Sequence, residues 1–228
     1  LMAFLTDKYN KIKAELALKN VTLVAVSKTK PVEDILEAYH TGQRDFGENY
    51  VQELVDKYEA LPKDIRWHFI GHLQSNKVKY IAPFVHLIHG VDSEKLLNEI
   101  NKQGKKINRV IPCLLQMHIS KEETKFGLDE TELKTIIEKI TTDQKAYDQI
   151  SLKGLMGMAS FTEDNELIIK EFNHLKRIFD QSNTQLSIIN YQLSILSMGM
   201  SADYGMAIEA GSNMVRIGSM LFGSRIVK

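Results

Sequence analysis

A lysine at the end of an apolar run is the first candidate for chemistry. Residues 21–28 (VTLVAVSK) are rich in β-branched side chains and are apolar on both faces of a strand, which is typical of a buried parallel strand. Lys28 therefore stands where that strand ends. Partial desolvation at such a position lowers the pKa of a lysine amine and favours Schiff-base chemistry. The alternative is that Lys28 and nearby Lys30 are solvated loop lysines, because most lysines are exposed.

Two segments near the end of the chain could bind an anion. In residues 197–203 (SMGMSAD), we expect Ser201 to act as the N-cap of a helix over 202–210, and the unpaired amides of a helix start attract phosphate. In residues 216–219 (RIGS), Gly218 lets backbone amides approach a ligand closely and Ser219 adds a hydroxyl. Each segment alone is also explained by an ordinary cap or an ordinary strand glycine.

Arg216 and Asn49 are further candidates. Arg216 lies inside an apolar strand, where a guanidinium must donate to a partner, and that partner is either an acid in a salt bridge or a ligand. If Arg216 and Gly218 share a strand face, both point to a ligand that Lys28 meets from across the barrel. Asn49 follows a predicted short strand, so it either caps the next helix or reaches the ligand.

The histidines do not form a recognised metal motif. His68 and His72 flank one short segment, and His86 and His89 lie on another predicted strand. A His-x-x-x-His spacing outside a helix lacks the context of a metalloprotease, and Cys113 is the single cysteine. We expect structural or ligand-stacking imidazoles and no metal site.

Strand-like and helix-like segments alternate along the whole chain. Eight alternations in 228 residues predict a closed parallel (β/α)8 barrel with an additional N-terminal helix, in one domain that spans residues 1–228. A doubly wound open sheet is the main alternative, but no G-x-G-x-x-G follows the first strand. We expect strands at 21–28, 45–48, 67–71, 85–91, 109–119, 152–159, within 187–198 and at 215–222, and helices at 32–40, 49–60, 76–81, 93–103 (stopped by Gly104), 129–141, 165–181 and 202–210.

Composition narrows the classes of function. The 29 basic and 29 acidic residues cancel, which argues against a nucleic-acid binder. The apolar runs are too short for a membrane span, residues 1–20 lack the apolar region of a signal peptide, and one cysteine rules out a disulfide framework. We expect a soluble, cytoplasmic protein. We also expect a monomer, because no exposed heptad or long apolar stripe indicates an interface with a partner.

Six blocks of this sequence together resemble the pyridoxal phosphate homeostasis protein family. They occur in order over nearly the whole chain, and their combination is specific. The blocks are 24–31 (VAVSKTKP), 46–53 (FGENYVQE), 67–77 (WHFIGHLQSNK), 154–158 (GLMGM), 196–203 (LSMGMSAD) and 215–219 (VRIGS).

The resemblance implies a barrel like the N-terminal domain of alanine racemase that binds pyridoxal 5′-phosphate (PLP). It implies that Lys28 forms the Schiff base and that Arg216 faces the pyridine nitrogen. It further implies that Ser201, Gly218 and Ser219 hold the phosphate, with Asn49 lining the site.

The implied function is non-catalytic: to hold PLP, protect the cell from the free aldehyde and supply apo-enzymes that need the cofactor. An arginine at the ring nitrogen weakens the electron sink, which is not decisive because alanine racemase has the same arrangement and is an enzyme. What differs is that the racemase has a second domain with a tyrosine acid/base, whereas only residues 223–228 follow the last strand here. The alternatives are a PLP-dependent amino-acid racemase and a Schiff-base aldolase acting on a phosphorylated sugar.

Overall fold

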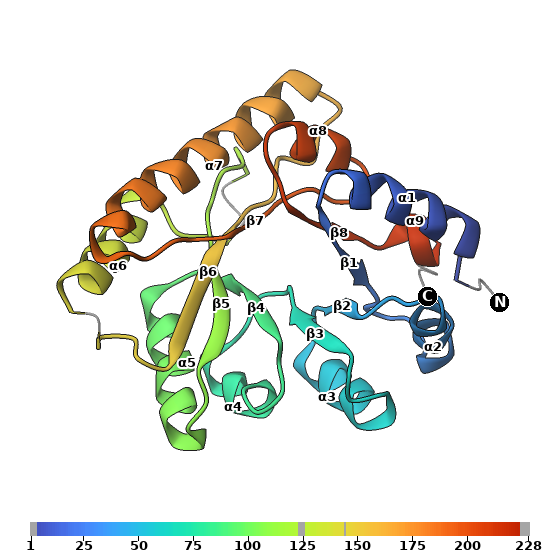
Figure 1. The fold of residues 1–228 in the computed structure, drawn as a ribbon, viewed down its shortest axis with the longest axis horizontal. Helices are drawn as coiled ribbons and strands as arrows, with labels where there is room; N and C mark the ends of the chain where they lie inside the picture. Colours follow the sequence, from blue (N-terminus) through green and yellow to red (C-terminus); the bar gives the residue numbers. More distant parts are fainter. Residues whose placement is uncertain (1–3, 123–125, 144, 224–228) are drawn as a thin grey trace.

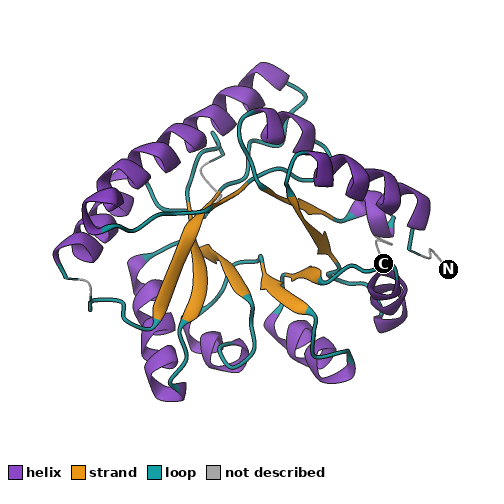
Figure 2. Cartoon of the chain, viewed as in Figure 1, coloured by secondary structure: helices purple, strands orange, loops and turns teal. Residues whose placement is uncertain are grey.

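Eight parallel strands form a closed barrel, with neighbours in chain order and β8 paired with β1. The structure is a computed structural model that describes residues 4–122, 126–143 and 145–223. Helices surround the strands on the outside (Figure 2). The prediction of a closed barrel is therefore confirmed, and the open doubly wound sheet is wrong.

The element bounds follow the expected alternation (Figure 1). The strands are β1 (Thr22–Val26), β2 (Asp45–Glu48), β3 (Arg66–Phe69), β4 (Leu87–Val91), β5 (Ile111–Gln116), β6 (Ile150–Met156), β7 (Ile195–Ser197) and β8 (Met214–Ile217). The helices are α1 (Thr6–Leu18), α2 (Val32–His40), α3 (Val51–Ala60), α4 (Val78–Ile81), α5 (Glu94–Ile107), α6 (Glu130–Thr142), α7 (Asn165–Leu186), α8 (Tyr204–Glu209) and α9 (Ser219–Phe222), with short 3₁₀ turns η1 (Ser75–Lys77) and η2 (Ser187–Ile189).

Alternate residues of each strand face the interior of the barrel, because successive side chains of a strand point to opposite faces. Along β1, Thr22 lines a cavity at the amino end of the strands. Val24 belongs to a small apolar cluster inside the barrel, and Val26 and Lys28 line a cavity at the carboxyl end. One face of β1 thus carries residues to three levels of the barrel.

The larger core lies between the strands and the helices. It contains most of the fully buried aromatic side chains, including Phe46, Trp67 and Phe172. Residues of the intervening strand face, such as Leu23 and Ala25 of β1, belong to this core. Strand β1 is therefore apolar on both faces within the barrel.

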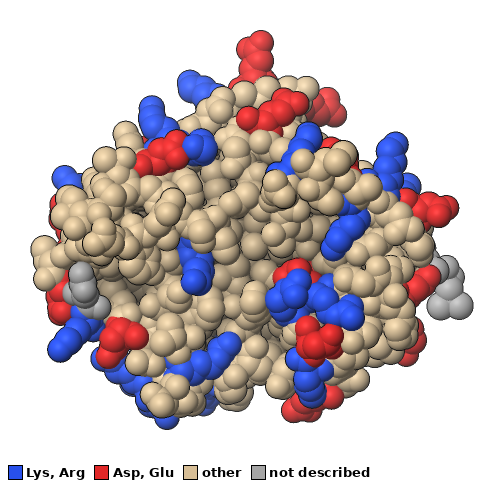
Figure 3. All heavy atoms as spheres, viewed as in Figure 1, with Lys and Arg blue, Asp and Glu red and all other residues tan. Residues whose placement is uncertain are grey.

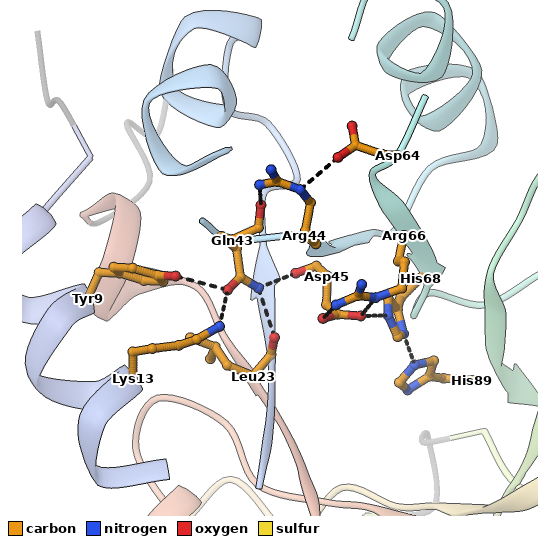
Figure 4. Close-up of polar contacts among 10 residues, drawn as sticks. All are labelled: Tyr9, Lys13, Leu23, Gln43, Arg44, Asp45, Asp64, Arg66, His68 and His89. Atoms are coloured by element: carbon orange, nitrogen blue, oxygen red, sulfur yellow. Dashed lines mark hydrogen bonds and ion pairs between the residues drawn. The ribbon is translucent and has the colours of Figure 1, made fainter. Parts of the chain in front are cut away.

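A buried glutamine, Gln43, joins helix α1 to the barrel strands (Figure 4). Gln43 Oε1 accepts hydrogen bonds from Tyr9 Oη at 3.3 Å and Lys13 Nζ at 3.1 Å. Gln43 Nε2 donates to the carbonyl oxygens of Leu23 at 2.9 Å and Asp45 at 2.6 Å. The side chain of Gln43 therefore ties α1 to β1 and β2.

Helix α5 corrects one expectation. The helix runs through Gly104 and ends at Ile107, and its C-cap Asn108 takes a left-handed conformation with φ 50°. A Cβ on Gly104 would lie 2.7 Å from the Arg109 carbonyl oxygen and 2.8 Å from Gln149 Cβ. Gly104 therefore allows close packing of the helix and does not stop it.

The expected strand at 215–222 is also corrected by the structure. The strand ends at Ile217, and Ser219–Phe222 form the short helix α9. Leu221 and Phe222 are fully buried, and the Leu221 carbonyl accepts a 2.8 Å hydrogen bond from the Leu5 amide. The apolar side chains after β8 therefore pack against the N-terminal segment instead of extending the strand.

Basic and acidic side chains are interspersed on the face of the molecule drawn in Figure 3, without a large area of one sign. In the part of the chain that the structure describes, no helix has the length and apolarity to cross a lipid bilayer.

Candidate cofactor site

A cavity of about 380 Å³ opens at the carboxyl end of the barrel strands. The six residues singled out in the sequence all line it: Lys28, Asn49, Ser201, Arg216, Gly218 and Ser219. They follow or end β1, β2, β7 and β8, and the loops at the carboxyl ends of barrel strands meet at one face. A different cavity, bordered by Leu97 and Tyr147 among others, contains none of these residues.

Lys28 lies two residues after the end of β1, and β1 pairs directly with β8. Val24 and Arg216 are opposite one another in this pairing. The expectation that Lys28 meets the ligand from across the barrel is therefore wrong, because barrel closure makes the first and last strands neighbours. That Arg216 and Gly218 share the inner face is consistent with both lining the cavity.

The loop that carries Lys28 has a strained backbone. Thr29 takes a positive φ of 62°, which a β-branched side chain rarely adopts. Its amide donates a 2.6 Å hydrogen bond to Glu53 Oε1 on α3. The Thr29 conformation is thus stabilised by a side chain of the neighbouring helix.

A buried ion-pair network lies directly behind this loop. Lys57 Nζ donates to Glu48 Oε1 at 2.8 Å, to Glu53 Oε1 at 2.7 Å and to the Ser27 carbonyl at 2.8 Å. Ser27 Oγ also donates to Glu48 Oε1 at 2.6 Å. Burial raises the pKa of Glu48 to about 7, although Lys57 and Ser27 act in the opposite direction. The network contacts the residues on both sides of Lys28.

The two predicted anion-binding segments lie against each other. The Gly218 amide donates a 3.3 Å hydrogen bond to Ser201 Oγ. A Cβ on Gly218 would lie 3.2 Å from Val26 Cβ and 3.3 Å from the Val26 carbonyl, so β8 leaves little room for a side chain there. Ser201 is not the N-cap expected from the sequence, because α8 begins later and Asp203 precedes it. The Ser201 hydroxyl therefore faces the cavity as a side-chain group and not as a cap.

Arg216 is almost fully buried under the cavity. Its Nη1 donates to Ser197 Oγ at 2.7 Å and to the Ser197 carbonyl at 2.9 Å, and its Nη2 donates to the Gly157 carbonyl at 3.1 Å. Burial lowers the pKa of Arg216 to about 10, and Asp203 opposes this shift. The guanidinium thus remains a cation at neutral pH.

Asn49 lines the cavity with a buried polar atom. Its Oδ1 makes no hydrogen bond within the described residues. The N-cap position of α3 belongs to Tyr50, so capping does not account for the Asn49 side chain. A buried acceptor without a partner indicates a position where a ligand or water donates a hydrogen bond.

The histidines group differently from their order in the sequence. His68 and His89 are hydrogen-bonded in the barrel interior, and the His86 ring lies 5.3 Å from that of His68. His72 lies elsewhere, 2.8 Å from Asp92 Oδ2 and stacked on Phe126. His68 and His72 therefore do not act as a pair, whereas His68, His86 and His89 lie close together.

Asp45, His68 and His86 place three possible ligand atoms within 4.8 Å of one another. Both oxygens of Asp45 already accept hydrogen bonds, from His68 and from Arg66, whose guanidinium would repel a cation. The arrangement fits an ion-pair network better than a metal centre, and the expected absence of a metal site stays a prediction.

Several cavity residues were missed in the sequence. Ile70 and Met158 follow inward-facing strand positions, while Met200 and Phe161 come from loops. The period of two along each strand could have identified the first two. The loop residues carry no such pattern, because their side chains are placed by turns that depend on distant contacts.

The fold and cavity define the class: a (β/α)8 barrel of the alanine racemase N-terminal type. The family model for "Alanine racemase, N-terminal domain" matches residues 3–226. A protein of Pasteurella multocida (strain Pm70) named pyridoxal phosphate homeostasis protein is 39% identical over 208 residues, 90% of this chain and 87% of that protein. This chain belongs to the pyridoxal phosphate homeostasis protein family.

Solved structures agree with this assignment. PipY of Synechococcus elongatus PCC7942, solved with PLP bound, superposes with a TM-score of 0.84 at 31% identity and covers 95% of this chain and 99% of that chain. Alanine racemase of Clostridium difficile 630 has a TM-score of 0.74 at 16% identity, with 98% of this chain and 57% of that chain covered. The second likeness concerns the fold alone.

Proposed function

We propose that this protein binds PLP through Lys28 and acts in PLP homeostasis without catalysing a reaction of its own. The observation that carries the proposal is that Lys28, two hydroxyls and a buried arginine line one cavity. Relatives that carry the name pyridoxal phosphate homeostasis protein, and the PLP-bound PipY structure, support it.

The groups around the cavity match the parts of PLP. PLP supplies an aldehyde that condenses with a primary amine, and a pyridine ring that withdraws electrons. Lys28 is the amine, and the hydroxyls of Ser201 and Ser219 with the Gly218 backbone form the phosphate-binding end. Arg216 would donate to the ring nitrogen, and the unpartnered Asn49 oxygen leaves an acceptor for a further polar group.

The presence of Arg216 favours binding of PLP over catalysis that uses PLP. A guanidinium is a donor at neutral pH, so the ring nitrogen that accepts its hydrogen bond stays unprotonated. An unprotonated ring stabilises a carbanion less well. The side chain of Arg216 therefore binds PLP and limits its reactivity.

Apart from Lys28, the described lining contains one side chain able to transfer a proton, Lys30, whose Nζ donates a 2.6 Å hydrogen bond to the Phe222 carbonyl. Among the described residues that line it there is no tyrosine, histidine or carboxylate. A racemase needs an acid and a base on opposite sides of its substrate. This supports a carrier over the alternative of an amino-acid racemase.

We further propose that residues 1–228 form one domain and that the protein is a cytoplasmic monomer. Apo-enzymes that require PLP are the proposed recipients of the cofactor. The mixed charge on the face in Figure 3 is in keeping with small-molecule binding and not with nucleic acid.

The test is covalent labelling of the parent protein. Protein loaded with PLP is reduced with borohydride, digested and mapped, and we expect the label on the peptide that contains Lys28. Lys28→Ala should lose that label, whereas Lys8→Ala, which changes an exposed lysine of α1, should keep it. A parent protein labelled only at other lysines would refute the proposal.

The racemase alternative has its own measurement. Exchange of the α-proton of added amino acids with deuterated solvent is followed by NMR. We expect no enzymatic exchange, and exchange at enzymatic rates that depends on Lys28 would establish the alternative.

A further inference from the structure

A chain of hydrogen-bonded side chains crosses the barrel interior beneath the cavity. His68 Nε2 lies 3.0 Å from Asp45 Oδ1, and His68 Nδ1 lies 2.9 Å from His89 Nε2. His89 Nδ1 lies 3.2 Å from Ser197 Oγ, which accepts the 2.7 Å hydrogen bond from Arg216 Nη1. Figure 4 shows the part of this chain from Asp45 to His89.

The chain connects the two ends of the barrel. Asp45 lines the cavity of about 410 Å³ at the amino end of the strands, and Arg216 lines the cavity at the carboxyl end. His68 and His89 lie between them on β3 and β4, and Ser197 lies opposite on β7. All five side chains are buried, His89 and Ser197 completely.

The carboxylate end fixes the direction of the hydrogen bonds along the chain when both imidazoles are neutral. Ionised Asp45 can only accept, so His68 donates to it from Nε2, and a neutral His68 then accepts on Nδ1 from His89 Nε2. A neutral His89 in turn accepts the Ser197 hydrogen on Nδ1, while Ser197 Oγ accepts from Arg216 with a lone pair. An ionised carboxylate can only accept, so the chain ends there without an unsatisfied group.

The charge state of the end groups agrees with this direction. Burial raises the pKa of Asp45, but hydrogen bonds from Arg66 and His68 outweigh it and hold this pKa well below its usual range. Burial also lowers the pKa of His89 well below its ordinary value, so His89 is neutral and has one donor and one acceptor nitrogen.

We propose that Asp45, His68, His89 and Ser197 form a positioning chain that orients the guanidinium of Arg216 toward the cofactor cavity. Its effect on PLP rests on the proposed function, whereas its hydrogen-bond direction does not. Ser197 Oγ offers its lone pair to Arg216 because His89 takes up the Ser197 hydrogen. With the carbonyls of Ser197 and Gly157 as the other acceptors, three fixed points define the plane of the guanidinium.

The first experiment reads the hydrogen positions directly in protein without PLP. Nitrogen-15 NMR of the histidine rings distinguishes the two neutral tautomers. We expect His89 to carry its proton on Nε2 and His68 to carry its proton on the nitrogen that faces Asp45. A His89 ring protonated on Nδ1, or on both nitrogens at neutral pH, would overturn the proposal.

The second experiment is a double-mutant cycle between His89 and Arg216, read as the Kd for PLP and the absorption maximum of the bound cofactor. We expect His89→Leu to weaken binding about 3- to 10-fold, as for the loss of one buried hydrogen bond, and to shift the spectrum in the direction of Arg216→Met. In the Arg216→Met background, His89→Leu should change the Kd by less than about twofold. Additive effects of the two changes would show that His89 does not act through Arg216.

A conservative variant separates hydrogen bonding from packing. His89→Gln keeps one donor and one acceptor, and we expect a Kd within about twofold of the parent value. A glutamine variant as weak as the leucine variant would contradict the role of His89 as a hydrogen-bonding link to Arg216. If His89→Leu does not fold, Ser197→Ala replaces it in the cycle, since this change removes only the hydroxyl that joins His89 to Arg216.

The two proposals fail in different ways. A parent protein that does not bind PLP refutes the proposed function, while the tautomers of His68 and His89 still test the chain. A parent protein that binds PLP but has the opposite tautomer of His89 refutes the chain alone.

Discussion

Individual residues around the cavity divide the work of binding by their chemistry. Lys28 offers a nucleophilic amine, Arg216 a buried cationic donor, and Ser201 and Ser219 neutral hydroxyls. Hydrogen bonds to a charged ligand are shorter and about twice as strong as those between neutral groups. The hydroxyls therefore contribute to binding of a phosphate even though neither carries a charge.

Ser201 is the hydroxyl whose loss should be easiest to measure. Ser201→Ala removes a donor to the phosphate and the acceptor of the Gly218 amide. We therefore expect the Kd for PLP to rise by about tenfold or more. Thermal unfolding of the PLP-free protein should change little, because Ser201 is only partly buried. The measurement is the Kd for PLP by fluorescence titration.

Ser187→Ala serves as the control for this change. Ser187 lies in η2, outside the cavity lining, so the Ser187→Ala protein should bind PLP with the affinity of the parent. Equal affinity of Ser201→Ala and the parent would remove Ser201 from the proposed site.

At the level of elements, helix α3 sets the conformation of the loop after β1. Glu53 of α3 accepts a hydrogen bond from the Thr29 amide, and Lys57 of the same helix donates one to the Ser27 carbonyl. A strained backbone persists only where surrounding contacts hold it, and such residues concentrate at functional sites. Lys28 lies between these two held positions, so α3 contributes to the site without lining it.

Glu53→Ala tests this tether. The change removes the acceptor of the Thr29 amide and one partner of Lys57, and we expect PLP binding to weaken about 3- to 10-fold, because the loop that carries Lys28 gains freedom. Glu59→Ala is the matched control, since Glu59 is exposed on the same helix. If the Glu53 variant binds PLP as tightly as the control, α3 does not position Lys28.

For the whole molecule, the barrel encloses charged groups that make stability depend on pH. Glu48 is fully buried, and burial raises its pKa to about 7 in the folded protein, against 4.5 in the unfolded chain. The folded state therefore binds more protons than the unfolded state between these values. Stability falls as the pH rises through this window, and the contribution is fully present below about pH 4.5.

Glu48→Gln removes this titration and keeps acceptors for Ser27 and Lys57. We expect the variant to gain stability relative to the parent between about pH 5 and pH 7, by roughly 3 kcal/mol in total, and to gain nothing further above about pH 8. Urea unfolding at several pH values measures this difference. A parallel pH dependence of parent and variant, like that expected for the control Glu59→Gln, would show that Glu48 titrates normally.

Two expectations about the whole chain stay predictions. One is that residues 1–228 form a single domain. Residues 224–228, which we expect after the last strand, lie outside the described residues. The other concerns the monomeric state, which bears on how PLP would pass to a recipient enzyme.

The sequence by itself determined the alternation of strands and helices and the residues that reach the cavity. Helix α2 and strand β2 have the expected bounds, and the six candidate residues come together in one cavity. These features follow from local rules: β-branched runs with a period of two, and polar residues at strand ends. Local signals suffice because the carboxyl ends of barrel strands meet wherever each strand happens to lie.

Only the tertiary structure decided which residues became neighbours across the chain. Closure placed Lys28 beside β8, the packing of α5 gave Gly104 a role inside a helix, and His89 met Ser197 although 108 positions separate them. Each of these contacts depends on the distance between strands around the barrel and on the volume left between elements. Neither quantity is present in a local pattern of residues, because both result from the packing of all eight strands and their helices together.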